Sequence, residues 1–131
     1  MPTDIPTVST AAYWTGWVIT GLVSLFFSFD AIAKILAVAP VVEASAKLGL
    51  PSSTTLPIGI LLLVCMVIYL VPQTSTIGAI LLAGYLGGAI AIHIRAEGGL
   101  FPVVFAAAFG ILVWLGLVLR EPKVWSAVWM R

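Results

Sequence analysis

Two pairs of charged or polar residues stand near the ends of long apolar stretches in this sequence. Asp30 and Lys34 are four residues apart, so they share one face of a helix, and an acid that precedes a base at this spacing favours an ion pair. His93 and Arg95 end the apolar stretch 78–95, where an ionisable side chain is costly unless it faces a bundle interior or a water-filled cavity. Because histidine gains and loses a proton near neutral pH, His93 is the first candidate for acid or base catalysis, with Asp30 as its partner.

Tyr85 and Arg95 are further candidates for ligand binding. Tyr85 precedes His93 by eight residues, about 80° away around the helix, where it can line a deeper wall of the same pocket. Arg95 is about 200° from His93, so it either reaches the lipid headgroups or turns inward to hold a carboxylate or phosphate. The structural alternatives are an ion pair of Asp30 and Lys34 that only orients its helix, and a His93 ring satisfied by the backbone. The sequence has one histidine, which leaves no partner for bis-histidine haem ligation, and we predict no metal site.

The composition is that of an integral membrane protein. Hydrophobic residues make up 62% of the 131 residues and charged residues 8%, whereas soluble domains have roughly 25% charged residues. A net charge of +1, without a basic run or a phosphate-binding loop, argues against a nucleic-acid partner. The single cysteine, Cys65, excludes an internal disulfide and CxxC thiol chemistry.

Four apolar runs are long enough to cross a bilayer as helices, which takes about 20 residues each. The predicted spans are residues 13–36, 55–71, 76–95 and 100–119. Between the first two, residues 40–49 predict a short helix that lies along the membrane surface, because Pro40 suits a first turn, Gly49 suits a C-terminal cap, and one face is apolar. The expected fold is an all-α, four-helix transmembrane bundle that forms a single domain over residues 1–131.

This topology places the candidate residues on one side of the membrane. The first and third helices both end there, so Asp30, Lys34, His93 and Arg95 are expected at similar depth, and the helix at 40–49 can cover an opening between them. Lysines and arginines are equally numerous on the two sides, so the positive-inside rule does not choose between them. We expect the protein in the cytoplasmic (inner) membrane with both termini in the cytoplasm.

Small residues in the third span predict close helix packing. Gly84 and Gly88 are four residues apart, as are Gly87 and Ala91, which leaves two strips of helix surface almost without side chains. Such strips let another backbone approach closely in lipid, so we expect this helix at the centre of the bundle. Exposure of these glycines on the exterior would instead favour contacts between copies of the chain.

Several segments resemble the DoxX-like family of small bacterial membrane proteins, and they follow one another over nearly the whole chain: FSFDAIAK, APVVEASAKLGLP, CMVIYLVP, GAILLAGYLGGAIAIHIR and LVWLGLVLREP. The resemblance implies a four-helix membrane bundle, with recurrent polar positions that correspond to Asp30, Lys34, His93 and Arg95. The family's name derives from relatives associated with thiosulfate:quinone oxidation. Relatives commonly carry a glutamate where this chain has Leu62, so this protein either lacks an activity that depends on that glutamate or performs it differently.

Three functions are compatible with these residues. The first is a cavity in the bundle that binds a small hydrophobic molecule, a quinone or a lipid-like compound, with Asp30, Lys34 and His93 at its polar end. The second is a membrane enzyme, an oxidoreductase component or an isomerase, that uses Asp30 and His93 as base and acid. The third is a structural or assembly subunit that forms a homo-oligomer or joins an oxidoreductase partner subunit. No flavin, nicotinamide or metal motif identifies a cofactor.

Overall fold

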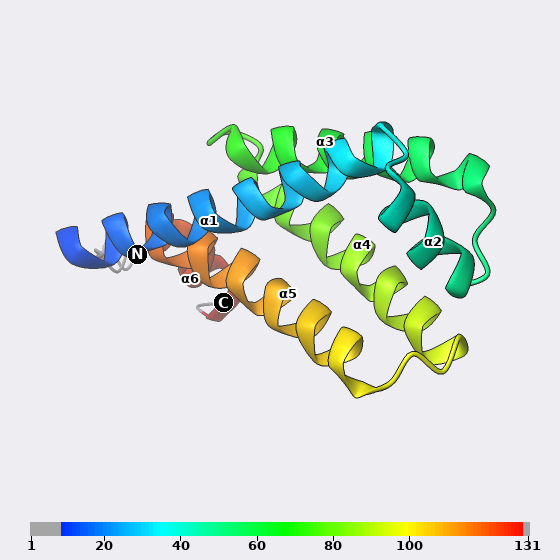
Figure 1. The fold of residues 1–131 in the computed structure, drawn as a ribbon. Coiled ribbons are helices and arrows are strands. Elements are labelled where there is room, and N and C mark those ends of the chain that lie inside the picture. The colour runs from blue at the N-terminus through cyan, green and yellow to red at the C-terminus, as the bar shows by residue number, and fades with distance from the viewer. Residues whose placement is uncertain (1–8, 130–131) are drawn as a thin grey trace.

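The computed structural model describes residues 9–129, which are almost entirely helical and contain no strand (Figure 1). The all-α, four-helix prediction is confirmed, because α1, α3 (with η1), α4 and α5 are long and apolar enough to cross a membrane. The elements in chain order are α1 (Thr10–Ile35), α2 (Ala39–Lys47), the 3-10 turn η1 (Ser52–Thr54), α3 (Thr55–Leu70), α4 (Ser75–Arg95), α5 (Leu100–Arg120) and α6 (Pro122–Trp129).

The helix ends follow from local sequence. α1 begins three residues earlier than predicted because the Ser9 side chain accepts a hydrogen bond from the Ala12 amide, 3.1 Å away. α2 ends in a Schellman motif, in which the amide of Gly49 donates to Ala46 and that of Leu50 donates to Ser45. Gly49 adopts a φ of 79°, a left-handed conformation that glycine takes at little cost. The predicted helix at 40–49 therefore stops at Lys47, and Gly49 lies just beyond it.

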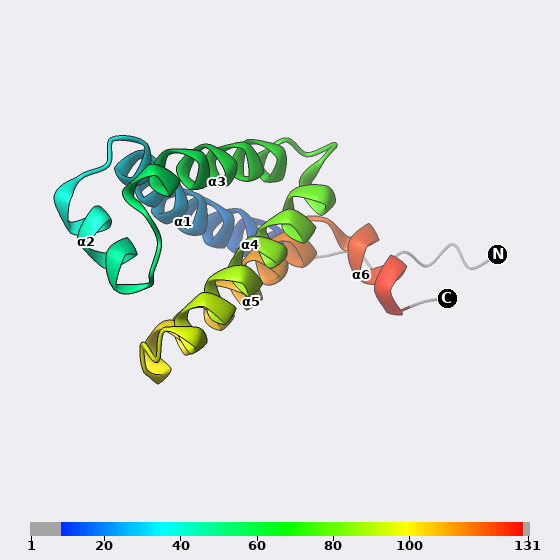
Figure 2. The ribbon, with the colours of Figure 1, turned by 90° about the vertical axis from the view of Figure 1, so that its right-hand side faces the viewer.

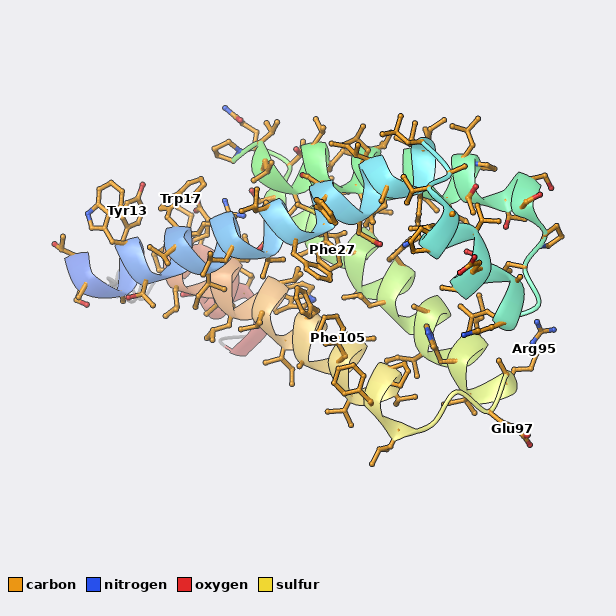
Figure 3. The ribbon with its side chains drawn as sticks, viewed as in Figure 1. Tyr13, Trp17, Phe27, Arg95, Glu97 and Phe105 are labelled. Carbon is orange, nitrogen blue, oxygen red and sulfur yellow. The ribbon has the colours of Figure 1, made fainter. Side chains whose placement is uncertain are left out.

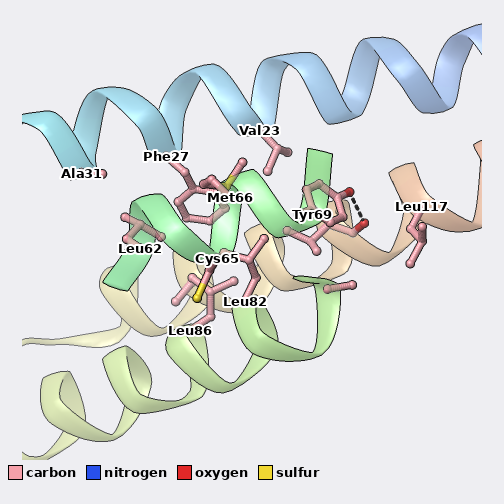
Figure 4. Close-up of a cluster of buried hydrophobic side chains, with 13 residues drawn as sticks. Val23, Phe27, Ala31, Leu62, Cys65, Met66, Tyr69, Leu82, Leu86 and Leu117 are labelled. Carbon is pink, nitrogen blue, oxygen red and sulfur yellow. Dashed lines mark hydrogen bonds between the residues drawn. The ribbon is translucent and has the colours of Figure 1, made fainter. Parts of the chain in front are cut away.

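The four long helices pack in a ring rather than around one central helix. α1 packs on α3 and α5, and α4 packs on the same two helices from the other side. A cluster of buried apolar side chains fills the space between them, with contributions from all four helices (Figure 4). Within it the hydroxyl of Tyr69 donates to the carbonyl of Val113 at 2.6 Å, which joins α3 to α5.

Close helix packing occurs at glycines other than those predicted. A Cβ on Gly16 would lie 2.9 Å from the carbonyl oxygen of Gly116, which shows how closely α1 approaches α5, and a Cβ on Gly78 would collide with the backbone of Tyr69. In contrast, a Cβ on Gly84, Gly87 or Gly88 would meet no described atom within 4 Å beyond the adjoining backbone of its own helix. The prediction that the helix at 78–95 forms the centre of the bundle is therefore wrong.

The ring is closed at one end and open at the other. The pair α1 and α3 diverges from the pair α4 and α5 toward the end that carries α2 and the α4–α5 loop (Figure 2). The glycine contacts described above lie toward the closed end, where the C-terminus of α3 meets the N-terminus of α4. This divergence makes room between the helices at the open end.

Candidate functional site

The open end contains a cleft whose polar residues come from α1 and α4. It consists of two pockets. The α3–α4 pocket, of about 490 Å³, lies between α3 and α4 beneath α2. The α1–α5 pocket, of about 270 Å³, lies between α1 and α5. Both pockets are lined by Lys34, Tyr85 and His93, and Asp30 lines the second. We call Asp30, Lys34, Tyr85 and His93 the polar cluster.

Asp30 and Lys34 form the ion pair that their spacing predicts. The Lys34 ammonium lies 2.5 Å from Asp30 Oδ2, and the two side chains are 20% (Lys34) and 32% (Asp30) exposed. The ammonium also donates to the hydroxyl of Tyr85 at 3.3 Å, which links α1 to α4 across the cleft. Since that hydroxyl accepts from Lys34, its own proton is available to a further acceptor.

His93 lines both pockets, and one of its ring nitrogens is bonded to the backbone. Its Nδ1 lies 2.7 Å from the carbonyl oxygen of Ala89, one turn earlier in α4. A carbonyl can only accept, so Nδ1 carries the hydrogen and Nε2 is the acceptor in the neutral ring. The backbone bond is the structural alternative predicted for His93, yet it leaves Nε2 free among the described residues. Gly98 of the α4–α5 loop packs beside the ring, since a Cβ there would lie 3.6 Å from His93 Cδ2.

Arg95 lies outside the cleft. Its guanidinium donates to the carbonyl of Leu48 at 3.3 Å and lies against Gly49, so it binds the C-terminal end of α2 (Figure 3). A cation at this position also interacts favourably with the partial negative charge of a helix C-terminus. The structure thus brings Asp30, Lys34, Tyr85 and His93 together and gives Arg95 a different partner.

The comparisons with known proteins agree with this architecture. The model of the DoxX-like family matches residues 18–130, a segment that contains α3, α4, α5 and every residue of the polar cluster. The chain belongs to the DoxX-like family. No curated protein and no solved structure matches it.

Leu62, the position at which the resemblance implies a glutamate in relatives, does not line the cleft. Its side chain is fully buried in the apolar cluster near Met66 and Phe27 (Figure 4). A carboxylate at this place would need a hydrogen-bonding partner that the apolar neighbours do not supply. Leucine is therefore consistent with the core of this chain.

A group of phenylalanines in the DoxX-like bundle was not among the predicted site residues. Phe101, Phe105 and Phe109 follow one another at intervals of four along one face of α5, and Phe26 and Phe27 approach them from α1. All five line the α1–α5 pocket next to Asp30 and Lys34. Their i, i+4, i+8 spacing in LFPVVFAAAFG was the signal available in the sequence.

Arg120 of this DoxX-like protein was also missed, because an arginine at the end of a span looks like a loop charge. It is 3% exposed and donates to Ser75 Oγ at 3.3 Å and to the Tyr69 carbonyl at 3.2 Å. The guanidinium lies 4.6 Å from the ring centroid of Trp17 and 4.9 Å from that of Tyr69. It has no carboxylate partner in the part of the chain that the structure describes. Arg120 therefore joins all four long helices at the closed end.

Proposed function

We propose that this membrane protein binds a small hydrophobic molecule, a quinone or a lipid-like compound, with its oxygen-bearing head at the polar cluster. The observation that supports the proposal best is the position of Lys34, Tyr85 and His93 between two largely apolar pockets. A few convergent polar groups in an apolar cavity are typical of small-molecule sites.

The polar cluster offers complementary groups to such a head. Lys34 and the Tyr85 hydroxyl can donate to a carbonyl oxygen, whereas Nε2 of His93 can accept from a hydroxyl. The side chains around the cleft are partly exposed on the apolar flanks of the helices, as for Leu61, Leu81 and Phe105. An apolar ligand would therefore enter from the bilayer, where such molecules concentrate.

Native mass spectrometry of the gently solubilised protein tests the proposal. We expect wild-type protein to retain a defined small molecule, and His93→Ala and Asp30→Asn to lose it while they stay folded. Glu97→Gln is the matched control, because Glu97 is exposed on the α4–α5 loop and lines neither pocket (Figure 3). Equal retention by wild type and both cluster variants would contradict the proposal.

An enzymatic role is the second candidate, because Asp30 and His93 line the same α1–α5 pocket. A substrate atom between them could give a proton to one and receive it from the other, as an isomerase requires. Incubation of the retained molecule with the protein in deuterated water would detect this exchange. His93→Asn, which keeps a polar side chain, should abolish deuterium incorporation, and incorporation at the wild-type rate would exclude His93 as acid or base.

An assembly role is supported by the exposure of Gly84, Gly87 and Gly88, the outcome that the sequence analysis connected with contacts between copies. Gly84 and Gly88 line the α3–α4 pocket, whereas Gly87 lines a groove on the outer side of α4 and α5 near Gly110. Gly87→Leu would fill this groove. A loss of oligomer mass in Gly87→Leu, with ligand retention unchanged, would assign this groove to a homo-oligomer contact.

A further inference from the structure

The two pockets that meet at the polar cluster differ in the chemistry of their walls. The α1–α5 pocket is lined by aromatic rings, chiefly Phe26, Phe105 and Phe109. The α3–α4 pocket is lined by aliphatic side chains and by bare helix backbone, as at Leu61, Leu81 and Gly84. A ligand that occupies both would therefore meet two different surfaces on either side of its polar atoms.

We propose that the α1–α5 pocket holds an uncharged, planar, conjugated ring and that the α3–α4 pocket holds an aliphatic tail attached to it, with the oxygen atoms of the ring at the polar cluster. This inference rests on the proposed function and specifies the ligand class of the same site.

The arrangement of the phenylalanines supports the ring position. The ring centroids of Phe26 and Phe109 are 4.6 Å apart and those of Phe105 and Phe109 are 4.7 Å apart, so three rings form a continuous aromatic wall. Phe26 and Phe105 are 41% and 38% exposed, so packing within the bundle leaves part of each ring accessible. Offset or edge contacts with a further ring are favourable beyond the apolar area that they bury.

The charge of the polar cluster favours an uncharged ring over an anionic headgroup. The Lys34 ammonium is paired with Asp30 at 2.5 Å, and this pair has no net charge. A phosphate or carboxylate head would bring a second negative charge to an ammonium that Asp30 already neutralises, and it would lose its hydration. A carbonyl or hydroxyl oxygen instead needs only the donors and acceptors that Lys34, Tyr85 and His93 present.

The shape of the α3–α4 pocket supports the tail position. Gly84 and Gly88 lie one turn apart on α4 and leave open space in the α3–α4 pocket, because a Cβ on either would meet no described atom within 4 Å beyond the adjoining backbone of α4. The same pocket is lined by Leu61 and Leu81, which are exposed on the flank of the bundle. A flexible chain can therefore follow α4 from the polar cluster toward the surrounding lipid.

Three probes test the two positions by equilibrium binding to the purified protein. They are dimethylnaphthoquinone, which is a ring without a tail, decylubiquinone, which is a ring with a tail, and dodecanone, which is a tail with a carbonyl but no ring. Phe105→Leu and Phe109→Leu keep the pocket apolar but remove aromatic faces. We expect each to weaken binding of both ring probes about fivefold and to leave dodecanone unchanged.

The control and the reciprocal variant complete the test. Phe29→Leu should change no affinity, because Phe29 is 75% exposed on α1 and lines neither pocket. Gly84→Leu should weaken the two tailed probes about tenfold and the tailless ring less than twofold, since about 1.4 kcal/mol corresponds to a factor of ten. Equal losses for ring and ringless probes in the phenylalanine variants would overturn the ring position while the proposed function stands. Absence of binding by all three probes to wild type would overturn both.

Discussion

Lys34 donates hydrogen bonds within its own helix, to Asp30, and across the cleft, to Tyr85. Lys34 therefore connects α1 to α4 at the open end. Among the described residues its ammonium is paired with one carboxylate, that of Asp30, in a setting that is largely apolar. Removal of that carboxylate leaves a charge in the cleft without a counter-ion.

Asp30→Leu should therefore destabilise the protein more than the loss of one hydrogen bond would. We expect the free energy of unfolding in mixed micelles to fall by about 1–3 kcal/mol, the cost of a buried polar group left unsatisfied. The double variant Asp30→Leu, Lys34→Met should recover most of this loss, because it removes both charges together. A single variant as stable as wild type would show that the ion pair is solvated.

Arg120 joins the four long helices at the closed end, so we expect its substitution to lower the stability of the bundle. Arg120→Met removes two hydrogen bonds and two cation–π contacts from the junction of α1, α3, α4 and α5. We expect a loss of about 2–4 kcal/mol in the free energy of unfolding. Lys123→Met is the control, since Lys123 is exposed on α6 and should change stability by less than about 0.5 kcal/mol. Equal effects of the two substitutions would contradict the role given to Arg120.

The helices themselves could be predicted from the sequence, because apolar runs of span length bounded by Ser9, Pro72 and Gly99 leave few alternatives. The sequence did not predict which glycines pack against a neighbouring helix. Gly84 and Gly88 have the spacing that is typical of a packed helix face. Which face of α4 contacts another helix, however, depends on how α4 is rotated against α3 and α5. Spacing and topology predicted that Asp30, Lys34, Tyr85 and His93 lie together, whereas the place of Arg95 depends on a contact with α2 that no periodicity shows.

The close packing of α4 on α3 can be tested by comparing Gly78, which lies in this contact, with Gly21, which lies on an exposed face of α1. Gly78→Ala places a methyl group against the backbone of Tyr69, which cannot move without disturbing the α3–α4 connection, so we expect a loss of about 1–3 kcal/mol. Gly21→Ala on the exposed face of α1 has open space around it among the described residues and should be neutral or stabilising by up to about 1 kcal/mol. Thermal unfolding in detergent measures both, and similar midpoints would contradict the close approach of α3 and α4.

The whole molecule is closed at the end that carries the start of α1 and helix α6, and it is open at the end that carries α2 (Figures 1 and 2). We expect both termini in the cytoplasm, and this orientation would place the open end on the outer side of the membrane. In a Cys65→Ala background, a membrane-impermeant maleimide should label Glu97→Cys in intact cells and should label Lys123→Cys only after permeabilisation. The reverse pattern would place the open end in the cytoplasm.

The central claim is that the cleft between the diverging helix pairs holds a small hydrophobic molecule. Gly88→Leu tests it most directly, because its side chain would enter the α3–α4 pocket without meeting any described atom at Cβ. Gly21→Leu adds the same side chain to an exposed surface outside the pockets. Native mass spectrometry should show the retained molecule in wild type and Gly21→Leu and its loss in Gly88→Leu at unchanged thermal stability. Retention of the same molecule by a folded Gly88→Leu protein would contradict the account.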